Sequence, residues 1–221
     1  MFLSRIQLNP QRRGAQRLLA NPQRMHAAVL SAFPDPPTGQ QPTGRVLWRT
    51  DQEGKRVFLY VVSPGEADLR HIAEQGGWPS TEHGESRDYG PFLERLDEGQ
   101  MWHYRLTANP VRYLSNETGG RARRGAHVTA AQQESWLLSK ARELGVNFSA
   151  GTDETSATLV TRRGTHSFSK GTHTPPVTIA WAQFDGVLRV VEPTALRRAL
   201  TLGIGPGKAY GCGLLTLAKV P

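Results

Sequence analysis

The sequence predicts an α+β protein built from two similar halves. Two short segments, RIQLNPQR at residues 5–12 and RLTANPVR at 105–112, share a strand pattern, an Asn-Pro pair and an arginine. Each copy opens a segment of about the same length, which indicates an internal repeat. Strand and helix patterns follow the second copy in the order β-α-β-β-α-β, the order of a ferredoxin-like domain, and follow the first copy in the order β-α-β-β-α. We therefore expect tandem ferredoxin-like domains, an N-terminal one at 1–92 that ends in a linker region and a C-terminal one at 93–221.

In the first half, helices are expected at Asn-Pro pairs and strands at apolar runs. Asparagine is a good N-cap and proline suits the first helical position, so we expect one helix from Asn9-Pro10 and a second from Asn21-Pro22. Two apolar runs flank DQEGK, which predicts a hairpin over 45–63. The other expected elements are an opening strand at 1–8, a Pro/Gly loop at 34–44, a short helix at 66–75 and the linker region at 76–92.

In the second half, an amphipathic helix is expected at 129–144, because its large apolar residues share one face. The residues expected to face inward are Trp136, Leu137, Leu138 and Leu144. Strands are expected at 100–108 and 213–217, and another helix at 193–200.

Two hairpins are expected between these helices. VTIAWAQF and VLRVVE, over 177–192, predict a hairpin that turns at Asp185-Gly186. The preceding insertion, ATLVTRRGTHSFSK at 157–170, predicts two further strands around Arg162, Arg163, Gly164 and Thr165. We therefore expect an inserted, protruding basic β-hairpin.

Charge and composition narrow the class of protein. The formal net charge of +8 over 221 residues favours a polyanionic partner, with nucleic acid first and an anionic membrane surface as the alternative. No run of about 18 apolar residues could span a bilayer, and the N-terminus lacks a secretory signal pattern. We expect a soluble, cytoplasmic protein with no membrane partner. The single cysteine, Cys212, is expected to be a small buried residue without an internal disulfide.

Basic residues gather in three tracts, at 9–13, 119–125 and 161–170, of which the second is expected to be unstructured. Scattered surface arginines explain any one tract, but three tracts on ferredoxin-like domains favour RNA. No strand carries the aromatic pattern of an RNA-reading sheet, so we expect RRM-like domains that grip a folded RNA stem through loops and hairpins. The expected RNA-binding residues are Arg12, Arg13, Arg121, Arg123, Arg124, Arg162, Arg163 and Lys170.

The histidines and carboxylates predict no metal site and no cofactor, because no pair has a metal-ligand spacing and no acidic cluster suits a two-metal nuclease. Metal-independent RNA cleavage would use the substrate's 2′-hydroxyl as nucleophile and needs a base, an acid and positive charge near the phosphate. His26 suits proton transfer, because it lies in the second turn of a helix that Asn21 caps, near the positive end of that helix. A surface or packing role for His26 is the alternative that this local pattern leaves open.

A glycine-rich segment, GIGPGKAYGCG at 203–213, follows the last expected helix. It is not a P-loop, because Leu202 stands where the first glycine of that motif belongs and Ala209 follows Lys208 in place of Ser or Thr. Its glycines, which indicate positive φ angles or the close approach of another segment or a ligand, are Gly203, Gly205, Gly207, Gly211 and Gly213. A packed helix-to-strand connection and a binding loop both explain them.

Several segments together resemble the CasE family, the CRISPR repeat-cleaving endoribonucleases of type I-E systems. They are the opening strand with LNP, LANPQRMH at 19–26, RLTANPVR at 105–112 and GIGPGKAYGCGLL at 203–215, and the resemblance runs essentially end to end. It implies metal-independent cleavage of the repeat stem-loop in precursor CRISPR RNA, leaving 5′-hydroxyl and 2′,3′-cyclic phosphate ends. It also implies that the product stays bound within a surveillance complex that contains other subunits.

Carried over residue by residue, the resemblance implies that His26 is the catalytic histidine and that the hairpin around Arg162 enters the RNA groove. It places the glycine-rich segment beside the RNA, where Lys208 would contact phosphate. Some relatives have a tyrosine three residues before the histidine, on the same helical face, but this chain has Gln23, which cannot transfer a proton. Arg24, Lys208 and Tyr210 are therefore candidate partners of His26.

Two other functions stay open. A non-catalytic subunit that binds the same stem-loop in a CRISPR surveillance complex is favoured by Gln23. A DNA-binding protein fits the charge, although the sequence contains no helix-turn-helix or zinc module. Chelator-insensitive cleavage would separate the enzyme from the binder, and competition between stem-loop RNA and duplex DNA would test the third function.

Overall fold

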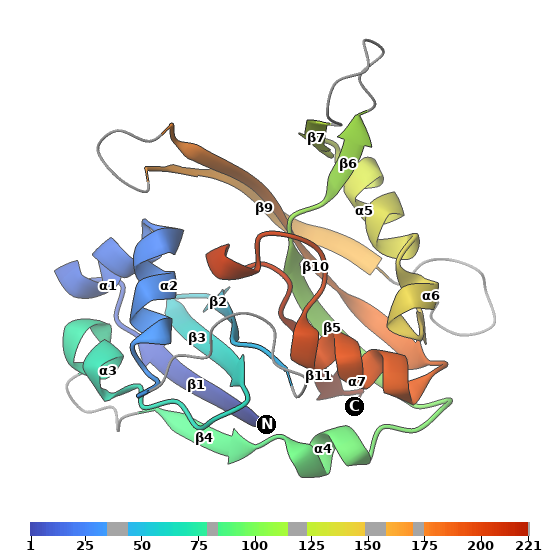
Figure 1. Ribbon diagram of the computed structural model, residues 1–221, viewed down its shortest axis with the longest axis horizontal. Helices are drawn as coiled ribbons and strands as arrows, with labels where there is room; N and C mark the ends of the chain where they lie inside the picture. The colour runs from blue at the N-terminus through green and yellow to red at the C-terminus, as the bar shows by residue number, and fades with distance from the viewer. Residues whose placement is uncertain (35–43, 79–83, 115–122, 149–157, 170–174, 221) are drawn as a thin grey trace.

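The computed structural model describes residues 1–34, 44–78, 84–114, 123–148, 158–169 and 175–220. It is a mixed α/β fold with antiparallel sheets (Figure 1). The helices are α1 (Arg13–Leu19), α2 (Pro22–Leu30), α3 (Arg70–Gly76), α4 (Gly90–Glu94), α5 (Ala130–Leu138), α6 (Ala141–Leu144), α7 (Pro193–Leu202) and the 3-10 helix η1 (Lys208–Tyr210). The strands are β1 (Phe2–Leu8), β2 (Leu47–Glu53), β3 (Arg56–Ser63), β4 (Glu85–Asp88), β5 (Met101–Ala108), β6 (Val111–Leu114), β7 (Arg123–Ala126), β8 (Val146–Asn147), β9 (Thr158–Phe168), β10 (Val177–Val190) and β11 (Leu215–Lys219).

The first half is a four-stranded antiparallel sheet in the order β2-β3-β1-β4. Helices α1, α2 and α3 pack against one face of it (Figure 1), where Ile6, Leu8 and Leu59 of the strands meet Met25 and Val29 of α2. The expected hairpin over 45–63 is confirmed as β2 and β3, which turn at Gly54. This packing holds α2, and with it His26, firmly on the sheet.

Two expectations for the first half were wrong. The first helix begins at Arg13 and not at Asn9-Pro10, because the Asn9 side chain accepts a hydrogen bond from the Gln11 N–H (3.0 Å) and forms a turn. The linker region at 76–92 contains β4, which pairs with β1. This edge strand is polar and mostly exposed, so its composition resembles a linker, and its pairing depends on the distant β1.

The second half has a sheet in the order β11-β5-β10-β8, with β9 also paired to β10. Helices α5, α6 and α7 cover one face of it, with Leu137 and Leu196 of the helices against Leu106, Phe184 and Leu188 of the strands. The expected strand at 100–108, the expected helix at 193–200 and the expected last strand are confirmed as β5, α7 and β11.

The expected turn at Asp185-Gly186 was wrong, because β10 runs without interruption through both residues. Each of them pairs with β5 on one side and β9 on the other, so backbone hydrogen bonds override the local turn signal. The expected insertion is likewise not two strands but the single strand β9. A basic hairpin is present, yet its strands are β9 and β10, which extend beyond the sheet toward the first half (Figure 1).

The long helix expected at 129–144 is divided into α5 and α6. Thr129 and Gln132 form a reciprocal capping box at its start. Trp136, Leu137 and Leu144 are buried as expected, whereas the inward position expected for Leu138 was wrong, because 36% of that residue is exposed.

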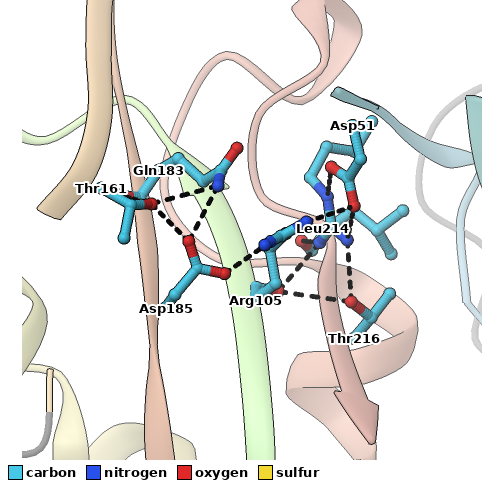
Figure 2. Close-up of polar contacts among 8 residues, drawn as sticks. Asp51, Arg105, Thr161, Gln183, Asp185, Leu214 and Thr216 are labelled. Atoms are coloured by element: carbon cyan, nitrogen blue, oxygen red, sulfur yellow. Dashed lines mark hydrogen bonds and ion pairs between the residues drawn. The ribbon is translucent and has the colours of Figure 1, made fainter. Parts of the chain in front are cut away.

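The two halves meet across the second face of the first sheet. Leu47 and Val62 of that sheet belong to the same apolar core as Leu106 and Leu215 of the second half. Beside them lies a cluster of charged and polar side chains from both halves (Figure 2). The apolar core of the second half therefore extends into the interface between the halves.

Candidate nucleic-acid interface and active site

His26 lies in the second turn of α2, on a helix whose start is locally determined. The Asn21 carboxamide accepts hydrogen bonds from the Gln23 N–H (2.9 Å) and the Arg24 N–H (3.3 Å), and Pro22 occupies the first turn, as expected. His26 is half-buried, and Gln23 precedes it by three residues on the same side of the helix. Because α2 contacts both η1 and β9, His26 lies on the helix where the two halves converge.

The structure separates the three candidate partners of His26. Arg24 lines a groove with His71 and Gln75 on the α1 and α3 side of the helix, away from η1. Lys208 and Tyr210 lie in η1, which contacts α2. The Lys208 ammonium donates to the Gly205 carbonyl (2.6 Å), and burial, together with the nearby charge of Arg45, lowers the pKa of this lysine.

The glycine-rich segment connects α7 to β11 and packs against β2. Its five glycines, Gly203, Gly205, Gly207, Gly211 and Gly213, all have φ between +70° and +92°. A Cβ at Gly211 would lie 2.8 Å from Trp48 Cζ3, and one at Gly203 would lie 2.7 Å from Leu47 Cδ2. Packing of the second half on the first therefore requires glycine at these two positions, which supports the interpretation of the segment as a packed connection.

The β9–β10 hairpin carries exposed arginines at the junction of the halves. Arg162 Nη2 donates to Gln52 Oε1 of β2 (3.1 Å), and Arg163 Nη1 donates to the Val128 carbonyl (3.1 Å). These contacts hold the base of the hairpin to both halves and leave both arginines at the surface, with Arg162 on the side of α2.

The other basic residues that the sequence singled out have different surroundings. Arg13 is exposed at the start of α1, whereas the Arg12 guanidinium donates to the carbonyls of Ala73, Glu74 and Gly77 at the end of α3, a structural role that the sequence did not indicate. Arg121 and Lys170 lie outside the described residues. Arg123 and Arg124 belong to β7, which pairs with β6, so the description of this tract as unstructured was wrong for its second part.

A buried ion pair on β2, which sequence reasoning missed, lies where the halves meet. Arg49 and Asp51 are 2% and 3% exposed, with Arg49 Nε 2.6 Å from Asp51 Oδ1. The Arg49 guanidinium also donates to the carbonyls of Arg105 and Leu214 and to Thr216 Oγ1, each at 2.8 Å. Opposite charges two positions apart on one strand, and therefore on the same face of it, were the signal that could have revealed it.

A second cluster continues this network into β9 and β10 (Figure 2). Asp185 accepts hydrogen bonds from Arg105 Nε (2.5 Å), Gln183 Nε2 (2.8 Å) and the Thr161 hydroxyl. Burial raises the pKa of Asp185, but the hydrogen bonds from Thr161, Arg105 and Gln183 outweigh it and lower the pKa below its ordinary value. The base of the basic hairpin is thus fixed to the strand that contacts Arg49.

Other residue types give little further chemistry. Within the part of the chain that the structure describes, no three His, Cys, Asp or Glu side chains gather as a metal site.

Cys212 is buried, as expected, and burial raises the pKa of its thiol to about 12, so it is no nucleophile at neutral pH. Among the described residues, no helix has the length and apolar character needed to span a membrane.

Comparison with known proteins places the chain among CRISPR proteins. Residues 1–219 match the family model described as CRISPR associated protein. CRISPR-associated endoribonuclease Cse3 of Thermus thermophilus is 29% identical over 231 residues, which cover 99% of this chain and all of that protein.

Solved structures show the same likeness. Thermus thermophilus Cse3 bound to an RNA representing a pre-cleavage complex is 28% identical with a TM-score of 0.75, over 99% of this chain and 98% of that one. A chain of a CRISPR RNA-guided surveillance complex in a pre-nicking state is 25% identical with a TM-score of 0.66, and the match covers all of both chains.

Proposed function

The chain belongs to this family of CRISPR-associated proteins, and on that premise we propose that it is an endoribonuclease that binds and cuts the repeat stem-loop of precursor CRISPR RNA. The observation that carries the proposal is the convergence of α2, η1 and the β9–β10 hairpin, which brings the helix of His26 and the exposed Arg162 together. The end-to-end likeness to RNA-bound Cse3 supports it. The likeness to a subunit of a surveillance complex supports retention of the product among partner subunits.

The proposed chemistry uses the RNA itself as nucleophile and needs no metal ion. A general base removes the proton of the 2′-hydroxyl, the O2′–P bond forms, and the P–O5′ bond breaks as a general acid protonates the leaving oxygen. The products are a 2′,3′-cyclic phosphate and a 5′-hydroxyl. His26 is the group on α2 that can hold or release a proton near neutral pH.

Gln23 and the glycine-rich segment have supporting roles in this proposal. The Gln23 carboxamide can donate a hydrogen bond to a phosphate oxygen but cannot transfer a proton. Lys208 and Tyr210 lie on η1 against α2, so either can be the second proton-transfer group, whereas Arg24 lies on another side of the helix. A protein that cuts once and keeps its product tolerates slow chemistry.

The RNA contacts and domain organisation belong to the same proposal. Arg162 and Arg163 grip the stem, and Arg13 extends the basic surface. Both halves have the strand order of a ferredoxin-like domain, β2-β3-β1-β4 and β11-β5-β10-β8, which supports tandem ferredoxin-like domains at 1–92 and 93–221.

A second candidate function is a stem-loop RNA-binding subunit without catalysis. Gln23 in place of a proton-transferring residue favours it. In that case the same side of the molecule holds the RNA, and His26 only packs or hydrogen-bonds.

The test is a cleavage assay of the cognate repeat hairpin in EDTA, beside a hairpin with a 2′-deoxy nucleotide at the cleavage position. We expect the first RNA to be cut and the second to be spared. His26→Ala should slow cleavage by about 10²-fold or more, as expected for loss of a general acid or base. The matched control is His103→Ala, an exposed histidine on β5, which should cleave at the parental rate. Tight binding without cleavage by the parental protein would refute the enzyme and favour the second function.

A further inference from the structure

A pocket of about 230 Å³ lies between the two halves, beside α2. It is bounded by the end of α1 and the start of α2, by β2, by the β9–β10 hairpin and by the glycine-rich segment, which converge in Figure 1. We call it the interdomain pocket. The lining residues that matter below are Trp48, Arg49, Asp51, Arg162, His166, Trp181 and Tyr210.

Aromatic rings form one wall of the interdomain pocket. His166 and Trp181 stack, with ring centroids 5.7 Å apart and planes 18° from parallel, and Tyr210 packs on Phe168 at 5.0 Å. Gly164 faces Trp181 across the strand pair, and a Cβ there would lie 2.9 Å from Trp181 Cζ2. The glycine therefore lets the indole lie across β9, and the wall is preformed.

Two tryptophans of this lining have an indole N–H that is buried and unused. Trp48 is 4% exposed, and within the described residues the buried indole N–H groups of Trp48 and Trp181 have no acceptor. An indole can only donate, and a buried donor without a partner is unfavourable. A ligand that brings carbonyl or ring-nitrogen acceptors would remove this cost. The edges of nucleobases carry such acceptors.

Size and charge restrict the occupant. The volume of 230 Å³ is below the roughly 300–1,000 Å³ of pockets for drug-sized ligands, which suits a single ring system. Arg49 and Asp51 pair with each other, so neither offers a spare charge for a phosphate inside. Arg162, by contrast, is exposed on β9 and can contact a phosphate outside the pocket.

We propose that the interdomain pocket binds one unpaired nucleobase of the RNA, with Trp181 as the stacking platform and Arg162 on the adjoining phosphate. The proposal rests on the proposed function, because it requires RNA along α2 and the hairpin. Proteins recognise unpaired RNA bases by stacking them on aromatic side chains and bonding their edges. His166 stacks beside Trp181 and extends this aromatic surface.

The test is a cycle of protein and RNA changes. The RNA is the cognate repeat hairpin with a 2′-deoxy nucleotide at the cleavage position, in which each unpaired nucleotide in turn is made abasic. Dissociation constants are measured for the parental protein, Trp181→Ala, Trp181→Phe and the control Trp78→Ala, an exposed tryptophan outside the pocket.

For the parental protein, we expect one abasic position to weaken binding about tenfold, the scale of one base stacked on an aromatic ring. Trp181→Ala should bind the intact hairpin about tenfold more weakly and lose this sensitivity at the same position. Trp181→Phe and Trp78→Ala should keep most of it.

Equal sensitivity of the parental protein and Trp181→Ala at every position would overturn the pocket proposal and leave RNA binding intact. If the parental protein does not bind the hairpin, both the proposed function and the pocket proposal are wrong. Should Trp181→Ala fail to fold, the fluorescent base 2-aminopurine is placed at each unpaired position of the RNA in turn, and its fluorescence is measured with the parental protein bound. Quenching at one position supports the pocket, and no quenching at any position refutes it.

Discussion

The substitution Arg49→Met tests whether the buried ion pair of β2, whose arginine also bonds to the second half, stabilises the fold. The Arg49 guanidinium makes two hydrogen bonds to Asp51 and three to Arg105, Leu214 and Thr216 of the second half. Methionine keeps an unbranched apolar side chain of similar length, so packing is largely retained. The change therefore removes the charge and the donors and leaves Asp51 buried.

The expected cost follows from the state of Asp51 in the variant. Removing one partner of a buried ion pair typically costs about 3–5 kcal/mol, because the other charge stays buried without compensation. Here Arg105 Nη1 lies 3.6 Å from Asp51 Oδ2 and compensates in part, so we expect the lower end of that range. At about 2–4 °C per kcal/mol for chains of 150–250 residues, a loss of about 3 kcal/mol lowers Tm by about 6–12 °C.

The assay is thermal and urea unfolding of the purified protein, followed by circular dichroism. The matched control is Arg162→Met, an exposed arginine, which should change the free energy of unfolding by at most about 0.5 kcal/mol. The double variant Arg49→Met with Asp51→Leu should recover part of the loss, because no unpaired charge stays buried. A loss below about 1 kcal/mol for Arg49→Met, or a double variant as unstable as the sum of the single ones, would refute this reasoning.

Three further predictions concern acid stability, the glycine-rich segment and RNA binding. Because the folded pKa of Asp185 is lowered, its stabilising effect is present above the unfolded pKa of about 3.9 and is lost as the pH falls through the folded value. Asp185→Asn should therefore be less stable than the parental protein at pH 7 and lose less between pH 5 and pH 2, and parallel acid unfolding curves would count against this. Gly211→Ala places a methyl group 2.8 Å from Trp48 at φ +80°, so it should lower Tm more than Gly54→Ala, which has an open site at φ +60°, and equal losses would contradict the contact. Arg162→Ala should weaken binding of the repeat hairpin and reduce the slope of log K against log salt by about 0.7–0.9, and an unchanged slope would remove Arg162 from the phosphate contacts.

Elements with strong local signals were predictable. The start of α2 follows from two neighbouring residues. The Asn21 side chain accepts hydrogen bonds from free backbone N–H groups of the first turn, and Pro22 has no N–H group that needs a partner. The β2–β3 hairpin and α7 likewise depend on residues that are close together in sequence. His26 could therefore be placed on a capped helix before its surroundings were known.

The wrong predictions share a physical cause. The polar strand β4 exists because its backbone pairs with β1, at least 80 positions earlier, and its side chains carry no apolar pattern. Asp185-Gly186 has the composition of a turn, but pairing on both sides keeps it extended. In both cases, hydrogen bonds with distant segments outweigh the local structural propensity of the sequence.

By itself, the sequence determined the order of most elements, the basic character of the chain, the helix that carries His26 and the need for glycine at 203–213. The tertiary structure decided which of these side chains meet. It turned Arg12 toward α3 and Arg24 away from η1, joined the Arg49 guanidinium to Arg105 and Leu214 of the second half, and brought Trp48 and Trp181 to one pocket. Local patterns could not show this, because these contacts join segments tens to more than one hundred residues apart, and packing of the whole chain selects them.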